Sequence, residues 1–545
     1  MSKLAIVALS AIALGACSPQ SGSAGPVVVL APDQTLSFPI AQDLADLDPA
    51  LIASPSDVDI LRNVFSGLYK FDDQLKEIPD LAVGLPTISP DRLTYTFHLR
   101  QGAKFSNGDP ITSADFIYSW TRAAARQGDY AWLFSSVAGY NDVAAGRADH
   151  LSGLSSPDDF TLVVALGKPA GNFLTEVGLW PYWVVDRQVI AAAGEDAWFT
   201  KPDTLIGSGP FRMTSWAPGQ SMDFAPVTGW YGGKTGAITR VHIEVQPDPA
   251  AQISQYEAGV FSLIGYARQS LSTAAATKYT SDPLLARQLS LAPLGVTYWV
   301  GFNLKTGPLA GDAGRDGRRA LSAAIDRNAL VDAVCNSGTQ CAAATGGLIS
   351  KGLQGYLGDS IDANAKFDTA GAKALYHAWD PAGSKLAGLA YTFDTNPFNK
   401  AVCANLATQW QANLGVTIAC VEMDRKTFLD ERNGSCAYPM FRQSWNADYD
   451  HPQDWFDHLF VGNASSSGSC YSNPSLDKLI AGADATGLAS ALADYKTAGQ
   501  MLVDNSTYTP LLYGVQAYLV HPNVTGAGGN ALYDDSWTSA SVLRQ

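Results

Sequence analysis

The sequence predicts an α/β protein made of several lobes. Segments that alternate apolar and polar residues, typical of strands, are interleaved along the chain with segments of helical spacing. The 545 residues are more than one hydrophobic core usually serves, so we expect two or three lobes. No long flexible linker separates independent domains, which favours lobes joined by several crossings of the chain, a layout suited to hinge closure.

The first half of the chain contains two strand patterns on either side of a helix pattern. Residues 93–100 (LTYTFHLR) alternate with a period of two and predict a strand. Thr112 or Ser113 can cap the helix that follows, and the acidic Asp115 suits the first turn of this helix. Residues 160–166 (FTLVVAL) predict a second strand.

The second half is richer in helical spacing. Apolar residues at helical intervals predict a helix over 316–334 and others over 399–414 and 488–505. The segment 416–421 between two of these helices predicts a strand. Strand and helix patterns therefore continue to alternate up to the C-terminal region.

The N-terminal segment has the features of an exported lipoprotein. Lys3 precedes an apolar run over 4–14, which is shorter than the ~20 residues that span a bilayer. The run ends in Leu-Gly-Ala-Cys, which resembles a bacterial lipobox. We therefore expect residues 1–16 to be a lipoprotein signal peptide and Cys17 to be lipidated; an ordinary signal peptide with an incidental cysteine is the alternative. Small polar residues make 17–26 a tether.

The charge and the hydropathy of the remaining chain exclude some partners. The formal net charge of −15 argues against binding to nucleic acid, whose phosphates would be repelled. No stretch after the leader is long and apolar enough to span a bilayer. The lipid would then be the only membrane attachment.

Six further cysteines suggest disulfides, because an exported protein folds in an oxidising compartment: Cys335, Cys341, Cys403, Cys420, Cys436 and Cys470. The first two flank a short, turn-rich loop. The middle two would join a helix to the next strand, which leaves the last two as a third pair, although other pairings remain open. A zinc site is the alternative, but neither CxxC nor HxxxH spacing supports it.

Several sequence blocks occur in a characteristic order: LDP at 47–49, LRNVFSGLYKFD at 61–72, LTYTFHLRQGAKFSNGDPITSADFIYSWTR at 93–122, GSGPFR at 207–212, RRALSAAIDR at 318–327 and QSWNADY at 443–449. Their order and spacing, from about residue 34 to the C-terminus, resemble those of the bacterial oligopeptide- and dipeptide-binding proteins. That family (solute-binding protein family 5) comprises the extracytoplasmic receptors of peptide ABC importers.

The resemblance implies a periplasmic binding protein-like fold of type II (cluster C). Such a fold has two lobes that enclose the ligand, plus an extra domain. Lobe I would comprise 27–64, 205–292 and 515–545. Lobe II, the extra domain, would be 65–204, and lobe III would be 293–514.

The resemblance also implies which residues hold a peptide. The family's acidic residue that pairs with the peptide ammonium corresponds to Asp448, which would otherwise be interpreted as a helix cap or turn residue. Ser444, Trp445 and Asn446 correspond to a segment whose backbone pairs with the peptide. Trp445 could pack against a ligand side chain, or it could be a half-buried core residue.

Two other segments depart from the family pattern. The opposite edge of the cleft falls on Ala53 and Ser54, where a family member carries an acidic residue at the first of these positions. Pro55 has no N–H to donate, so the register of the peptide on that side stays open. Arg442 and Arg432 are the candidates for the peptide carboxylate. One extra residue between them leaves the preferred peptide length open, and Arg432 could instead be a solvated surface residue.

We therefore expect a lipid-anchored receptor that captures oligopeptides and delivers them to the permease subunits of an ABC importer. It would act as a monomer, without a cofactor and without enzymatic activity. Murein-peptide recycling or sensing is an alternative within the same class. An exported hydrolase is the alternative from another class, but no G-x-S-x-G, HExxH or Cys–His arrangement supports it.

A receptor for a metal complex, of nickel or haem type, is the remaining alternative. It rests on a cluster of potential metal ligands, two of them spaced i, i+4: Asp448, Asp450, His451, Asp454, Asp457 and His458.

Overall fold

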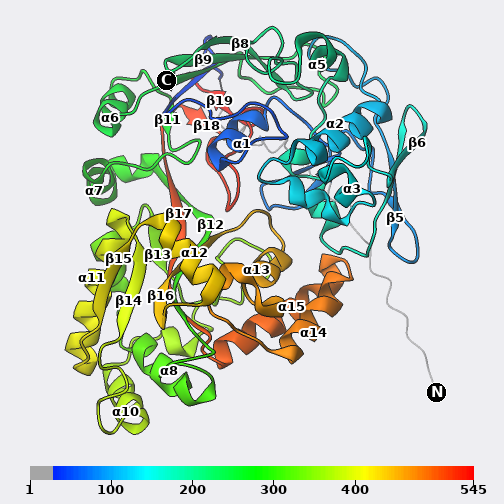
Figure 1. The fold of residues 1–545 in the computed structure, drawn as a ribbon. Coiled ribbons are helices and arrows are strands. Elements are labelled where there is room, and N and C mark those ends of the chain that lie inside the picture. The colour runs from blue at the N-terminus through cyan, green and yellow to red at the C-terminus, as the bar shows by residue number, and fades with distance from the viewer. Residues whose placement is uncertain (1–28, 545) are drawn as a thin grey trace, which may run out of the picture.

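The computed structural model describes residues 29–544, in which strands and helices alternate as predicted (Figure 1). The strands form three larger sheets and two small two-stranded ones. The predicted signal peptide, Cys17 and the tether lie outside the described residues. The first two residues of the proposed lobe I, 27 and 28, also lie outside them. No helix within the described range is both long and apolar enough to cross a membrane.

One four-stranded sheet lies in the upper part of Figure 1, in the order β1-β10-β9-β8. Its strands are Thr35–Ile40, Arg240–Val245, Ser221–Pro226 and Phe211–Ala217. β1 pairs in parallel with β10, so the sheet joins the N-terminal region to a segment about 200 residues later. The buried Trp537, near the C-terminus, packs its ring against Phe211 and Phe224 of this sheet.

A second sheet of four antiparallel strands has the order β4-β5-β7-β6. Its strands are Thr87–Ile88, Thr94–His98, Thr161–Ala165 and Leu154–Asp158. Helix α2 (Ser113–Arg126) contacts this sheet. Thr112 caps it as predicted: its N–H and its hydroxyl both donate to Asp115, at 2.8 Å each.

The largest sheet has the order β11-β17-β12-β16-β14-β15, with β13 also paired to β17. Its strands are Leu263–Ile264, Tyr508–Val520, Leu289–Phe302, Met440–Asn446, Ala390–Asp394, Ala419–Met423 and Cys341–Ala343. The long antiparallel strands β12 and β17 run from the upper half of Figure 1 into the lower half. They are therefore covalent connections between the two halves.

Helices cover the lower part of this sheet: α8 (Arg315–Ala323), α9 (Arg327–Val334), α10 (Thr369–Trp379) and α11 (Pro397–Leu414). The prediction of one continuous helix over 316–334 is wrong. Asp326 adopts an extended backbone, and its carboxylate accepts hydrogen bonds from the N–H groups of Asn328 and Ala329. These bonds cap a new helix, so the chain breaks into α8 and α9. The strand predicted over 416–421 begins later, at Ala419.

The remaining helices are α1 (Pro55–Leu61), α3 (Tyr140–Ala144), α4 (Phe173–Glu176), α5 (Arg187–Ala193), α6 (Pro249–Glu257), α7 (Thr273–Ser281), α12 (Arg425–Ser435), α13 (Pro452–Leu459), α14 (Pro474–Asp484) and α15 (Leu488–Asp504). The small sheets pair β2 (Tyr69–Phe71) with β3 (Glu77–Pro79), and β18 (Val524–Thr525) with β19 (Ser541–Val542).

The six cysteines of the described chain form three disulfides: Cys335–Cys341, Cys403–Cys420 and Cys436–Cys470. These are the pairs considered from the sequence. The first closes the turn-rich loop after α9. The second ties α11 to β15, and the third joins the end of α12 to the loop that precedes α14.

Candidate functional site

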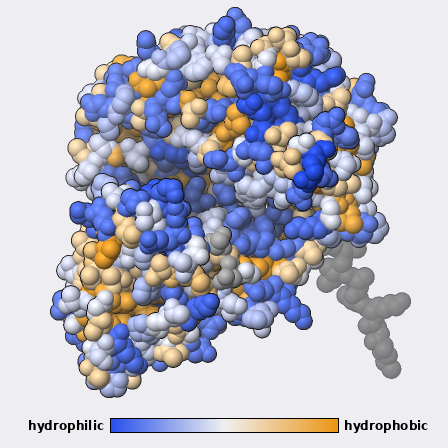
Figure 2. All heavy atoms as spheres, viewed as in Figure 1, coloured by the Kyte–Doolittle hydropathy of each residue, from blue (hydrophilic) through white to orange (hydrophobic). Residues whose placement is uncertain are grey.

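A cavity of about 170 Å³ lies where segments from distant parts of the sequence meet. Figure 2 shows the surface hollowed between the upper and lower halves of the molecule. Apolar groups dominate the cavity wall and a few polar groups converge on it, as is typical of ligand sites. The lining residues are Pro55, Val58, Tyr130, Trp180, Arg268, Leu294, Asn446, Ala447, Asp448, Ala531, Leu532 and Tyr533.

Asp448 is the acidic group of this cavity, two residues after the end of β16. Its Oδ1 accepts a hydrogen bond of 3.0 Å from the hydroxyl of Tyr130. Burial raises the pKa of the Asp448 carboxyl, while the hydrogen bond from Tyr130 acts in the opposite direction. Asp448 is thus a partly desolvated carboxyl that faces a small cavity.

Asp454, in the first turn of α13, lies directly behind Asp448 and is fully buried. Its Oδ2 accepts from Trp445 Nε1 at 3.0 Å and from the N–H of Asp448 at 3.3 Å. Its Oδ1 has no hydrogen-bond partner in the part of the chain that the structure describes. Burial and the neighbouring Asp448 raise the pKa of Asp454 well above its usual range. We therefore treat Asp454 as the protonated member of the pair at neutral pH.

Aromatic rings fix the surroundings of Asp448. The ring of Tyr130 meets that of Trp180 edge to face, with the centroids 4.6 Å apart. Trp180 Nε1 donates to the carbonyl oxygen of Ile52 at 2.9 Å, which connects this cluster to the segment before α1. The ring of Trp445 stacks on His458 at 5.2 Å, and Trp445 does not line the cavity. Trp445 is thus half-buried, and its packing against a ligand side chain stays a prediction.

Helix α1 reaches the cavity through Pro55 and Val58. Ala53 is exposed, and Ser54 is the residue that precedes the helix. The carbonyl oxygen of Ser54 accepts from the N–H groups of Asp57 and Val58. Neither of the two predicted residues lines the cavity, and only Ser54 is directly followed by a lining residue, Pro55.

Strand β16 has a free backbone edge beside the cavity. It pairs with β12 along its whole length, from Met440 to Asn446. It pairs with β14 only at Met440 and Phe441. Within residues 29–544, no strand therefore pairs with that edge between positions 442 and 446, where Ser444 and Asn446 lie. An unpaired edge of this kind can accept an extended chain as an additional strand.

Arg442 lies on the same face of β16 as Ser444, because side chains alternate along a strand. Its Nε donates to Asp394 Oδ1 at 2.6 Å, and its Nη1 donates to Ser444 Oγ at 2.8 Å. Arg425 also donates to Asp394, at 3.0 Å. Two guanidinium groups thus share one carboxylate, which leaves a surplus of positive charge at this end of β16.

Arg432 is buried, so its interpretation as a solvated surface residue is wrong. It lies in the last turn of α12, its side chain is only 5% exposed, and its Nη1 donates to Gln443 Oε1. Its guanidinium lies 5.3 Å from the centre of the Phe428 ring, and that of Arg442 lies 5.9 Å from the same ring. Burial and the positive charge of Arg442 lower the pKa of Arg432 to about 9.

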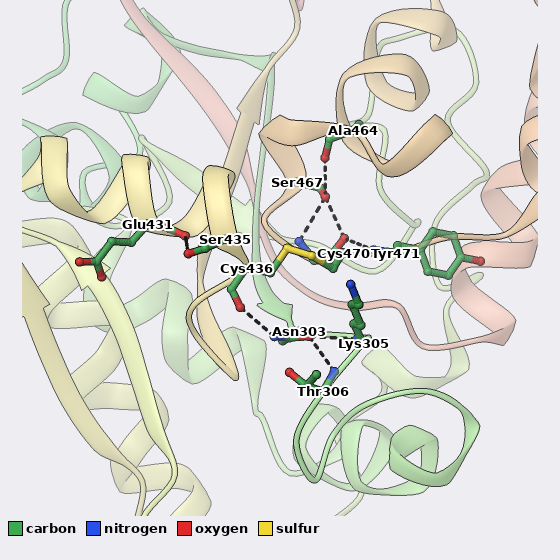
Figure 3. Close-up of a disulfide and its surroundings, with 11 residues drawn as sticks. Asn303, Lys305, Thr306, Glu431, Ser435, Cys436, Ala464, Ser467, Cys470 and Tyr471 are labelled. Atoms are coloured by element: carbon green, nitrogen blue, oxygen red, sulfur yellow. Dashed lines mark hydrogen bonds between the residues drawn. A yellow bond between two sulfur atoms is a disulfide. The ribbon is translucent and has the colours of Figure 1, made fainter.

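The disulfide Cys436–Cys470 joins the end of α12 to the loop that contains Ser467 (Figure 3). In this loop, Gly468 lies against the side chain of Arg432. The carbonyl oxygen of Cys436 accepts from Asn303 Nδ2 at 2.7 Å, which fixes the end of α12. On the loop side, Ser466 accepts from Gln443 Nε2 at 2.7 Å through its carbonyl oxygen. The disulfide therefore connects the loop to the hydrogen bonds that orient Arg432.

The structure brings only some of the predicted residues to the cavity. Asp448 and Asn446 line it, Ser444 lies on the free edge of β16, and the two arginines lie farther along the same strand and on α12. Sequence reasoning missed Tyr130, Trp180 and Arg268, because no local spacing links these residues to the QSWNADY block. Among the described residues, no group of three or more His, Cys, Asp or Glu side chains is arranged to hold a metal ion.

Comparisons with known proteins agree with this fold. Residues 76–467 match the family model of bacterial extracellular solute-binding proteins, family 5. The periplasmic murein peptide-binding protein MppA of Escherichia coli is 27% identical over 91% of each chain. The periplasmic oligopeptide-binding protein OppA of the same species is 26% identical over 94% of this chain and 93% of its own.

Solved structures show the same architecture. The unliganded open form of MppA has a TM-score of 0.83 at 24% identity, covering 95% of this chain and 99% of the other. OppA of Burkholderia pseudomallei has a TM-score of 0.70 at 25% identity, covering 94% of this chain and all of its own. The chain belongs to the bacterial extracellular solute-binding proteins, family 5, and has the type II periplasmic binding protein fold.

Proposed function

We propose that this protein is a lipid-anchored receptor that captures oligopeptides outside the cytoplasm and delivers them to an ABC importer. The observation that carries the proposal is the position of Asp448. Its carboxyl lies in a small cavity beside the free edge of β16, and the wall around it is mainly apolar. The names of the similar proteins, which bind oligopeptides and a murein peptide, support the same ligand class.

The α-ammonium of a peptide would bind Asp448. A hydrogen bond between charged groups contributes about 1.5–3 kcal/mol, and the apolar wall reduces competition from water. Tyr130 already donates to one carboxylate oxygen at 3.0 Å, which holds the carboxyl in place for a second donor. The charged amino terminus would therefore fix the start of the peptide.

The backbone of the peptide would pair with the free edge of β16 at Ser444, Trp445 and Asn446. Main-chain pairing provides affinity without reading side chains, which suits a receptor for many sequences. Arg442 and Arg432 would attract the carboxylate at the other end. The surplus positive charge around Asp394 supports that role.

Closure of the cleft would complete the site from the other half of the molecule, at Ala53 and Ser54. Lobe I (27–64, 205–292 and 515–545) and lobe III (293–514) would move relative to each other, with lobe II (65–204) attached. The long strands β12 and β17 are suited to act as the hinge, because they connect the two halves. We propose that the receptor acts as a monomer, without a cofactor or catalysis.

Mass spectrometry of the molecules that co-purify with the native protein tests the proposal. We expect short peptides with free amino termini to be released on denaturation. After refolding, the protein should bind a mixed tripeptide library. A preparation that yields no peptides and binds none from the library would contradict the proposed function.

Lipid anchoring is tested separately, on Cys17. The Cys17→Ser variant should move from the membrane fraction to the soluble fraction, while peptide binding stays the same. Equal membrane association of both forms would contradict the anchor.

A further inference from the structure

Arg268 is a second charged group in the cavity that contains Asp448. Its Nε donates to Asp59 Oδ2 at 2.9 Å, and its side chain is 19% exposed. Its two terminal amino groups have no hydrogen-bond partner among residues 29–544, and neither is sealed from solvent. The guanidinium thus keeps donors free for a group that enters the cavity.

The backbone at Arg268 has an unusual conformation. Ala267 and Arg268 are both left-handed, with φ of 53° and 60°. Two consecutive residues of this kind, neither of them glycine, are costly and persist only where the surroundings hold them. The N–H of Ala267 donates to Asp534 Oδ2 at 2.6 Å, and its carbonyl oxygen accepts from Ser56 Oγ at 2.9 Å. The fold therefore fixes Arg268 at the cavity wall.

Arg268 supplies the positive charge of the cavity wall. Asp59 is its direct partner. Burial and the charge of Asp59 raise the pKa of Asp534 well above its usual range, which favours the protonated form of Asp534. In the lining of this cavity, Arg268 is the cationic residue and Asp448 is the acidic one.

We propose that Arg268 is a specificity-determining residue that binds a carboxylate located close to the free ammonium of the ligand. The inference rests on the proposed function, in which Asp448 binds that ammonium. Because both residues line one cavity of about 170 Å³, the two charges of the ligand must lie within one or two residues of each other. Two kinds of peptide meet this condition. One carries aspartate or glutamate at its first or second position, and the other has a γ-linked glutamate with a free α-carboxylate.

Isothermal titration calorimetry of five tripeptides tests the inference. Ala-Glu-Ala, Glu-Ala-Ala and the γ-linked form of Ala-Glu-Ala are compared with Ala-Gln-Ala and Ala-Ala-Glu. At least one of the first three should bind the wild-type protein about ten-fold more tightly than Ala-Gln-Ala does, as expected for one charge-assisted hydrogen bond. Ala-Ala-Glu should show no such gain. The γ-linked peptide separates a preference for an acidic side chain from one for a free α-carboxylate.

Two arginine variants separate recognition from a structural role. In Arg268→Gln, the preference should disappear while the affinity for Ala-Gln-Ala stays the same. Arg62→Gln is the matched control and should retain the preference, because Arg62 does not line this cavity. Arg268→Lys keeps the positive charge but lacks the planar guanidinium group with its several donors. This variant is used instead if Arg268→Gln does not fold.

The outcomes that contradict the inference differ from those that contradict the proposed function. Equal affinity of the wild-type protein for all five peptides would overturn the role of Arg268 and leave peptide binding intact. An equal loss of affinity for acidic and neutral peptides in Arg268→Gln would assign Arg268 a structural role only. No binding of any peptide would overturn both proposals.

Discussion

The hydroxyl of Tyr130 donates a hydrogen bond of 3.0 Å to Asp448 Oδ1, across a separation of 318 positions in the sequence. The bond joins a segment just after α2 to the loop between β16 and α13. It therefore links the proposed lobe II to the proposed lobe III at the candidate ligand site. It also presents one oxygen of the carboxylate to a neutral donor, which leaves other lone pairs for a ligand.

Tyr130→Phe should weaken peptide binding by about ten-fold, because the variant loses a hydrogen bond to a charged group. The hydrogen bond from Tyr130 lowers the pKa of Asp448, so its loss also reduces the ionised fraction of that carboxyl. Titration calorimetry at pH 6 and pH 8 measures both effects, and the defect should be larger at pH 6. Tyr140→Phe, a partly buried tyrosine outside the cavity, is the control. Unchanged affinity in Tyr130→Phe would contradict this role of the bond.

Removal of the Cys436–Cys470 disulfide should affect both stability and binding. The chain-entropy relation gives about 4 kcal/mol for its separation of 34 residues, and about 2 kcal/mol for the separation of 6 residues in Cys335–Cys341. Thermal unfolding of the paired serine variants should therefore rank the first loss above the second. Peptide affinity should fall only in the first variant, because only that disulfide holds the loop that lies against Arg432. Equal peptide affinities in the two variants would show that the loop held by Cys436–Cys470 does not contribute to peptide binding.

The stability of the protein should depend on pH through Glu176. This carboxyl is buried, accepts from Asn172 Nδ2 at 2.9 Å, and has one oxygen without a partner in the described structure. Burial raises its pKa from the usual 4.5 to about 8. Between these values the folded state binds more protons than the unfolded state, so the free energy of unfolding falls as pH rises.

Glu176→Gln removes this proton linkage. The variant should unfold at the same temperature as the wild-type protein at pH 5 and at a higher temperature at pH 8.5, measured by calorimetry. Glu244→Gln, at a partly exposed position near the end of β10, is the control and should change little at either pH. A variant that is no more stable than the wild-type protein at pH 8.5 would show that Glu176 is not a strained buried carboxyl.

The sequence predicted those parts of the fold that local physical chemistry determines. The start of α2 follows from Thr112 and Asp115 alone, since a capping box needs only neighbouring residues. The break between α8 and α9 was missed, because the apolar spacing continues through it and only the hydrogen bonds of Asp326 reveal it. The long strands β12 and β17 were not recognised either. Register shifts interrupt their pairing, and Pro293 and Gly295 interrupt the pattern of β12.

The candidate site was predicted through resemblance rather than through local pattern. The QSWNADY block identified Asp448, and the family match over 76–467 confirms the family that the blocks indicated. Tyr130 and Arg268 carry no such signal. Their roles depend on contacts between positions hundreds of residues apart, which only the folded chain brings together. The lobe boundaries remain a prediction.

The central claim is that Asp448 binds the free ammonium of a peptide, and one calorimetric comparison tests it most directly. Trialanine and N-acetyl-trialanine are titrated into the wild-type protein and into Asp448→Asn, which keeps the shape of the side chain but removes the charge. Loss of a charge-assisted hydrogen bond predicts that acetylation weakens binding to the wild-type protein by ten-fold or more. In Asp448→Asn, acetylation should have little effect. Equal affinity of the wild-type protein for the free and the acetylated peptide would contradict the account.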